Sequence, residues 1–152
     1  MFKTLIPAAA SVALVAFAAQ TQSLAPEADG MSWHLSQEGA MAKLAYGAEN
    51  SDQLALMVTC SPGDTTAVVY GDVRPVSPRL IHASSGPEML DPLSGGDAYE
   101  TRIALNDSTL RSLASRGSMR VSDGEQQFDL RADGAERRAI SGFLSYCSSV
   151  RV

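Results

Sequence analysis

The sequence contains few of the residues from which metal centres and nucleophilic sites are built. Its 152 residues include two cysteines, two histidines and one tryptophan. Cys60 and Cys147 lack the close C-x-x-C spacing of zinc sites, and His34 and His82 lie in no recognisable catalytic motif. There is no G-x-S-x-G nucleophile elbow, and the carboxylates are scattered through turns and helix starts without isolating a pair. We therefore predict no catalytic residue, no metal and no cofactor.

Long apolar runs are also scarce, and the one that occurs lies at the N-terminus. A single basic residue, Lys3, precedes an apolar stretch that ends in small residues around Ala18. This pattern is typical of a secretory leader, so we predict a signal peptide over residues 1–18 with cleavage after Ala18. An uncleaved membrane anchor is the weaker alternative, because Pro7 interrupts the run and polar residues follow it. We expect a periplasmic or secreted protein with no stable membrane insertion after cleavage.

Export bears directly on the two cysteines. An even cysteine count in an oxidising compartment predicts pairing, so we expect one disulfide between Cys60 and Cys147. In the chain-entropy description, closing so long a loop stabilises the fold by about 4 to 5 kcal/mol. A metal pair or a catalytic thiol is the competing interpretation.

Positive charge is in short supply. The chain has 12 Lys and Arg against 17 Asp and Glu, a net charge of −5, and loss of Lys3 with the leader makes it more negative. A negative field repels polyanions, so we expect no nucleic-acid partner. Lys43 is the only lysine after the leader, and this arginine bias, together with the alanine-rich leader, favours a bacterial origin.

The rest of the chain is predicted to form one domain. Residues 19–30 are polar and without periodicity, which indicates a flexible lead-in, and residues 31–152 form a single β-rich domain. Alternation of apolar and polar residues predicts strands in which Trp33, Leu35 and Cys60 point inward and His34 points outward. Further strands are expected over 40–46, 54–60, 65–70 and 99–105, with a short edge strand at 80–81.

Helix signals occur twice. Asp107 is placed to cap a short helix that ends at Gly117. Asp133 and Glu136 resemble a capping box, and an apolar stripe follows at Ile140, Phe143, Leu144 and Cys147. This spacing predicts a C-terminal helix whose cysteine faces the core.

Two turns have sequence signatures. The sequence from Ser61 to Asp64 (SPGD) favours a type II turn. Asp123-Gly124 predicts a two-residue type I′ hairpin, in which Met119 would face Phe128 and Val121 would face Gln126. The predicted fold class is α+β: mainly an antiparallel β-sandwich or open barrel of about seven strands, with a short helix and a C-terminal helix tied by a disulfide.

One long connection stands out. Residues 83–97 carry Met89, Leu90 and Leu93 among prolines and glycines. Long connections in small domains are often functional, so these three residues are a candidate partner-contacting loop. The alternative is a loop that folds its apolar side chains onto the core.

Several residues resemble those of small exported bacterial proteins of uncharacterised function. They are Trp33, the stretch Leu44-Ala45-Tyr46-Gly47, Cys60 and the Phe143-Leu144-x-x-Cys147 terminus. The resemblance covers both ends of the domain well and its middle poorly. It implies export, one disulfide and a β-rich fold, and it transfers no catalytic residue.

From the sequence we expect an exported, non-enzymatic binding or inhibitor-like module of the bacterial envelope, with an unknown protein or envelope ligand as its partner. A small envelope hydrolase and a structural envelope component are the alternatives. An exposed apolar patch would favour the binding module, whereas a converging acid, base and nucleophile would favour the hydrolase.

Overall fold

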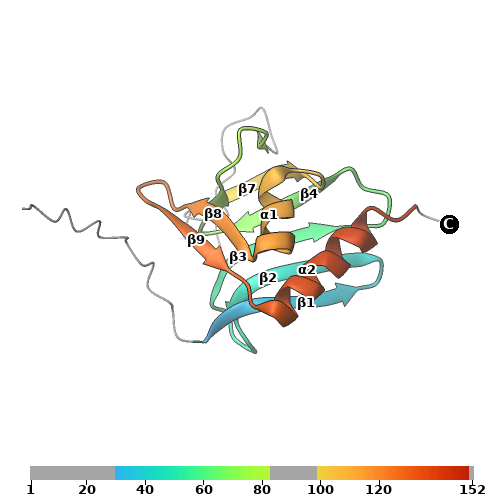
Figure 1. Ribbon diagram of the computed structural model, residues 1–152, viewed down its shortest axis with the longest axis horizontal. Coiled ribbons are helices and arrows are strands. Elements are labelled where there is room, and N and C mark those ends of the chain that lie inside the picture. The colour runs from blue at the N-terminus through green and yellow to red at the C-terminus, as the bar shows by residue number, and fades with distance from the viewer. Residues whose placement is uncertain (1–29, 83–98, 151–152) are drawn as a thin grey trace, which may run out of the picture.

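The computed structural model describes residues 30–82 and 99–150, which form two antiparallel sheets and two helices (Figure 1). The larger sheet has six strands in the order β1-β2-β3-β4-β7-β6, and the smaller has the order β5-β8-β9. The strands of the larger sheet are β1 (Met31–Glu38), β2 (Met41–Ala48), β3 (Leu54–Cys60), β4 (Thr66–Gly71), β6 (Ile81–His82) and β7 (Tyr99–Ala104). Those of the smaller are β5 (Arg74–Pro75), β8 (Ser118–Ser122) and β9 (Gln127–Arg131), and the helices are α1 (Ser108–Arg116) and α2 (Gly134–Cys147).

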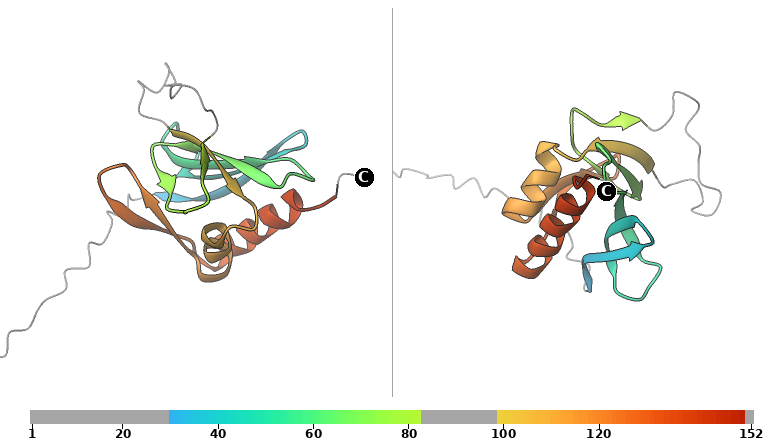
Figure 2. Two further views of the ribbon diagram at one scale, coloured as in Figure 1. Left: turned by 90° about the horizontal axis from the view of Figure 1, so that it is seen from above. Right: turned by 90° about the vertical axis from the view of Figure 1, so that its right-hand side faces the viewer.

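The helices and the smaller sheet cover one face of the larger sheet. Figure 2 shows α1 and α2 side by side on this face. The core lies between the layers, because each strand turns alternate side chains toward the helices. From the sheet come Leu44, Leu56, Val58, Val69 and Ile103, and from the other layer come Leu110, Leu113, Met119, Val121, Ile140 and Phe143, all buried.

The first strand is anchored at Trp33. Its ring is buried, lies 5.2 Å from the ring of Tyr46 between centroids, and donates from Nε1 to the carbonyl of Arg131. The alternation also predicts that Leu35 is buried, but 41% of it is exposed. The reason is its place in β1, the edge of the sheet, where it has a neighbouring strand on one side only.

Both helices begin and end largely as the sequence predicts. The Asp107 carboxylate accepts from the N–H of Thr109, and Gly117 ends α1 in the left-handed conformation at φ 70°. Asp133 and Glu136 form the reciprocal capping box of α2, and Ile140, Phe143 and Cys147 are buried. These contacts satisfy N–H groups that a helix start leaves without partners.

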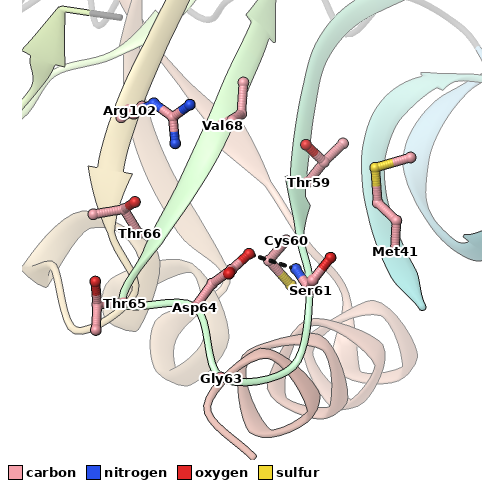
Figure 3. Close-up of a pocket in the computed structure, with 10 residues that line it drawn as sticks. All are labelled: Met41, Thr59, Cys60, Ser61, Gly63, Asp64, Thr65, Thr66, Val68 and Arg102. Atoms are coloured by element: carbon pink, nitrogen blue, oxygen red, sulfur yellow. Dashed lines mark hydrogen bonds between the residues drawn. The ribbon is translucent and has the colours of Figure 1, made fainter. Parts of the chain in front are cut away.

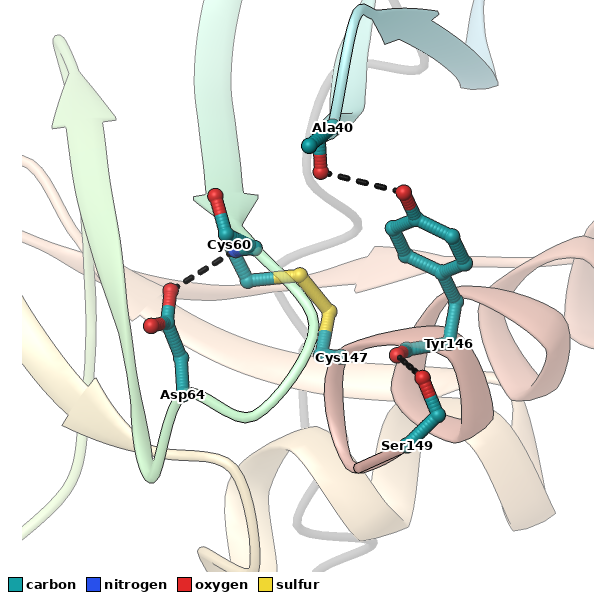
Figure 4. The surroundings of a disulfide bond; sticks show 7 residues. Ala40, Cys60, Asp64, Tyr146, Cys147 and Ser149 are labelled. Carbon is teal, nitrogen blue, oxygen red and sulfur yellow. Dashed lines mark hydrogen bonds between the residues drawn. A yellow bond between two sulfur atoms is a disulfide. The ribbon is translucent and has the colours of Figure 1, made fainter. Parts of the chain in front are cut away.

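The predicted disulfide is confirmed between Cys60, at the end of β3, and Cys147, in the last turn of α2 (Figure 4). Cys60 faces the core because it lies in register with Ala42, another inward residue. The N–H of Gly63 also donates to the carbonyl of Cys147, at 3.0 Å. The Tyr146 hydroxyl donates to the carbonyl of Ala40 in the turn between β1 and β2. The disulfide and these two hydrogen bonds therefore fasten the end of α2 at three points.

The two predicted turns have different outcomes. The turn from Ser61 to Asp64 forms as expected, with Gly63 at φ 85° and the N–H of Asp64 donating to the carbonyl of Ser61. The register predicted around Asp123-Gly124 is wrong. Met119 pairs with Leu130 and Val121 with Phe128, so the connection spans residues 123–126.

The Asp123 side chain explains the longer turn. Its Oδ1 accepts from the N–H groups of Glu125 and Gln126, and these bonds, the Gln126 bond first, lower the pKa of the carboxyl. Only Gly124 of the dipeptide has positive φ, whereas a type I′ turn needs two such residues. The aspartate thus closes a wider loop through its own side chain, as aspartates in turns often do.

The α+β class, the antiparallel pairing and the disulfide-tied helix are confirmed. The layering differs from the predicted sandwich or open barrel. Within the described residues, strands β1 and β6 each pair on one side only, so the six-stranded sheet is open there, and helices with a small sheet form its second layer. Strand β5 was not predicted, because a strand of only Arg74 and Pro75 has no detectable alternation.

Candidate functional site

The second face of the six-stranded sheet carries no helix among the residues that the structure describes (Figure 2). We call it the outer face. Strand register brings its side chains into rows. One row contains His34, Ala45, Met57, Tyr70 and Glu100, and the next contains Ser36, Lys43, Thr59, Val68, Arg102 and Ile81.

The outer face mixes apolar and polar side chains. Met57, Val68 and Tyr70 are half-buried against their neighbours, and Ile81 is 53% exposed at the β6 edge. A solvated face of an antiparallel sheet is normally polar, which makes adjacent Met, Val and Tyr side chains informative. The arrangement suits contact with a ligand of mixed polarity.

A depression lies where the outer face meets the turn between β3 and β4 (Figure 3). Its volume is about 410 Å³. Thr59 contributes from β3, Thr66 and Val68 from β4 and Arg102 from β7. Its other lining residues are Met41, Cys60, Ser61, Gly63, Asp64 and Thr65. The type II turn and the end of β3 therefore shape one wall of the depression.

The two charged side chains that line the depression differ in whether they already have a hydrogen-bond partner. Oδ2 of Asp64 accepts from the N–H of Ser61 at 2.7 Å, so this carboxylate serves its own turn. The Arg102 guanidinium is exposed and makes no hydrogen bond or ion pair with another described residue. Between the threonine hydroxyls and this cation, the depression offers hydrogen-bond donors to a polar or anionic group.

A serine and a histidine also meet on the outer face. Ser32 Oγ lies 2.9 Å from Nε2 of His34, two residues along β1. This is the contact distance of a nucleophile and its base, but a triad needs a third group to orient the histidine. Within the described residues no carboxylate forms a hydrogen bond or ion pair with His34. In the described part of the chain, Ser32 and His34 therefore form a pair and not a triad.

The structure describes only some of the predicted site residues. Cys60 and Cys147 are bonded, whereas Ala18, Met89, Leu90 and Leu93 lie outside the described residues, as do the predicted leader and most of the lead-in. The chain leaves the described part at β6 and returns at β7, two neighbouring strands. The candidate partner loop thus connects two strands that pair with each other in the six-stranded sheet.

Sequence reasoning missed the outer face. The available signal was Met57, an apolar residue between the inward-facing Leu56 and Val58. Apolar residues at both alternating positions show that a strand has apolar side chains on both faces.

Two further observations bear on the class of site. The described residues contain no group of three or more His, Cys, Asp or Glu that could hold a metal ion. Among those same parts of the chain, no helix is long and apolar enough to cross a membrane.

Comparison with protein-family models, curated proteins and solved structures finds no match to this chain. The resemblance to small exported bacterial proteins therefore depends on the quoted residues alone. The function has to be argued from the geometry of the outer face.

Proposed function

We propose that the protein is an exported, non-enzymatic binding module of the bacterial envelope, and that the outer face is its binding surface. The observation that carries this proposal is a sheet face that no helix of the described residues covers. On it Met57 and Tyr70 lie in the row next to Val68 and Arg102, which line the depression. Apolar side chains provide contact area, and the cation and hydroxyls fix orientation.

The scaffold behind this face supports the same function. Antiparallel pairing over most of the sheet and the Cys60–Cys147 bond hold the surface in one shape, so little order has to be acquired on binding. The segment containing Met89, Leu90 and Leu93 starts and ends at the same sheet, in β6 and β7. In this proposal those three residues extend the contact surface.

A charge reversal at the depression tests the binding surface. Arg102→Glu changes the outer face, and Arg138→Glu makes the same change on the exposed side of α2, as a matched control. Wild type and both variants are immobilised and exposed to envelope extract, and retained protein and glycan are identified by mass spectrometry. We expect a component retained by wild type and by Arg138→Glu and lost by Arg102→Glu. Equal retention by all three, or retention by none, would overturn the proposed surface.

Export is tested separately. A leader cut after Ala18 gives a mature protein that begins at Ala19, and the intact mass of the exported chain identifies that start. A species beginning at Met1 in the periplasmic fraction would contradict the proposed compartment.

The hydrolase is the second candidate, because Ser32 and His34 are in contact. Ser32→Ala and His34→Ala would each abolish hydrolysis of a chromogenic ester if the pair were catalytic. The binding proposal expects no hydrolysis above that of buffer in the wild type. If the protein instead has a structural role in the envelope, the immobilised protein should retain no extract component through its outer face.

A further inference from the structure

The two edges of the six-stranded sheet differ in how well they are protected against pairing with another strand. Strand β6 has only two residues, and Pro78 lies shortly before it. Strand β1 has eight residues, no proline, and no irregularity in its register with β2. Long regular edges invite pairing with another strand, whereas short ones discourage it. The β1 edge is therefore the one suited to strand addition.

The turn between β1 and β2 fixes which main-chain groups face this edge. Glu38 pairs with Met41 across a two-residue connection, and Gly39 has φ 59°, as the first central residue of a type II′ turn requires. In such a hairpin the closing pair is hydrogen-bonded, and pairs alternate from there. Ser36 and His34 therefore bond to β2, while Trp33, Leu35 and Gln37 direct their N–H and C=O groups outward.

A hydrogen bond from the main chain to a side chain agrees with this alternation of outward groups, and it shows where the unpaired part of the β1 edge begins. The outward N–H of Trp33 donates to Oε1 of Glu136, at 2.7 Å. No such contact covers Leu35 or Gln37 within the part of the chain that the structure describes. The edge is thus closed at Trp33 and open from Leu35 to Glu38, where all four residues are exposed.

We propose that this open segment pairs with the same segment of a second copy of the chain, in an antiparallel homodimer with Ser36 on the two-fold axis. Leu35 then exchanges both main-chain hydrogen bonds with the partner's Gln37, and Gln37 does the same with the partner's Leu35. The register centred on Leu35 instead would pair the partner's Gln37 with Trp33, whose N–H already has an acceptor.

The side chains agree with this register. His34 lies opposite the partner's Glu38 on the outer face, an imidazole beside a carboxylate, and no two like charges face each other. On the other face, Leu35, which is 41% exposed in the single chain, lies diagonally across from the partner's Leu35. The two outer faces become one continuous surface, independently of what that surface binds.

Engineered cysteines test the register directly. Residues that face each other in a non-hydrogen-bonded antiparallel pair have Cα atoms about 4.5 Å apart, within the range of a disulfide. Ser36→Cys should therefore give a reducible covalent dimer of the mature protein. Ser32→Cys is the matched control on the same face of the same strand, and the proposed register separates it from its copy by about 27 Å. It should remain monomeric on a non-reducing gel.

Sedimentation equilibrium of the unmodified mature protein provides the second measurement. We expect dimer formation that increases with concentration and is weakened at least tenfold by Leu35→Pro. The proline removes an N–H that faces away from β2, and edge strands tolerate a proline at such a position. Circular dichroism checks that the fold of this variant is retained. Leu35→Lys repeats the test without altering the main chain. A protein that is monomeric at all concentrations, equal cross-linking of the two cysteine variants, or a dimer unaffected by both Leu35 substitutions would overturn the proposal. A monomer that pairs through β1 only with an added extended peptide would overturn it too.

Discussion

Cys60 and Cys147 join the end of β3 to the last turn of α2 across 87 residues of sequence, with their Cα atoms 5.7 Å apart. The bond closes a loop that contains every element from β4 to α2. Cys60 is also one of the residues that line the depression beside the outer face. One end of the bond that stabilises the domain is therefore at a residue that borders the candidate site.

Replacing Cys147 by serine should lower the free energy of unfolding by about 4 to 5 kcal/mol in the chain-entropy description. Cys60→Ser should cost about the same. Because either change breaks the same bond, the double variant should be no less stable than the weaker single variant. Urea unfolding of all three measures this. Additive losses in the double variant, or two free thiols in the denatured, non-reduced wild type, would contradict it.

Gly71 should not tolerate a side chain. It ends β4 at φ 148°, and an added Cβ would collide with the carbonyl oxygen of Ala55 and lie 2.9 Å from Cα of Leu56. We expect Gly71→Ala to destabilise the fold by about 2 to 4 kcal/mol, through clash and backbone strain. Gly142→Ala is the control, because nothing lies within 4 Å of a Cβ there and the residue is helical. It should stabilise by about 0.5 to 1 kcal/mol, and equal thermal melts for the two variants would be inconsistent with this packing.

Glu136 should contribute more to stability than an ordinary capping residue. One carboxylate oxygen accepts from the N–H of Asp133 and the other from the N–H of Trp33, so the side chain links α2 to β1. Glu136→Ala should cost about 1 to 3 kcal/mol in urea unfolding, because two N–H groups lose a charged acceptor. Glu125→Ala, in the exposed turn after β8, is the control and should change stability by less than about 0.5 kcal/mol. A similar small effect at Glu136 would show that the link to Trp33 is not formed in solution.

Substitution of Met89, Leu90 and Leu93 distinguishes a binding role of this segment from a role in covering the core. If these residues contact a partner, changing all three to serine should alter stability by about 0.5 kcal/mol or less per residue and abolish binding. If they cover the core instead, the triple variant should lose several kcal/mol. Thermal melts of the variant beside the retention assay separate the two. A large loss of stability would remove this segment from the proposed binding surface.

Much of the domain could be predicted because its signals are local. Alternation located β1 to β4 and β7, and it placed Cys60 on the inner side. Asp133 and Glu136 marked the start of α2, since a capping box needs only residues three apart in sequence. The disulfide followed from the cysteine count together with the expected export.

The remainder depended on contacts that sequence patterns do not encode. The turn after β8 widened because the Asp123 carboxylate accepts two N–H groups, which overrides the dipeptide's preference for a shorter turn. Leu35 is exposed because strand order places β1 at an edge, and strand order was not predicted. The outer face was missed for the same reason. Met57, Val68 and Arg102 come from β3, β4 and β7, and only sheet pairing brings them together.

The central claim, that the outer face is a binding surface, is tested most directly by NMR. Amide resonances of the isotopically labelled mature protein are followed while fractions of envelope extract are added. The account predicts that one fraction shifts amides of Thr59, Val68 and Arg102 and leaves those on the exposed side of α2, such as Arg138, unchanged. Shifts confined to α1 and α2, or no specific shift with any fraction, would contradict it.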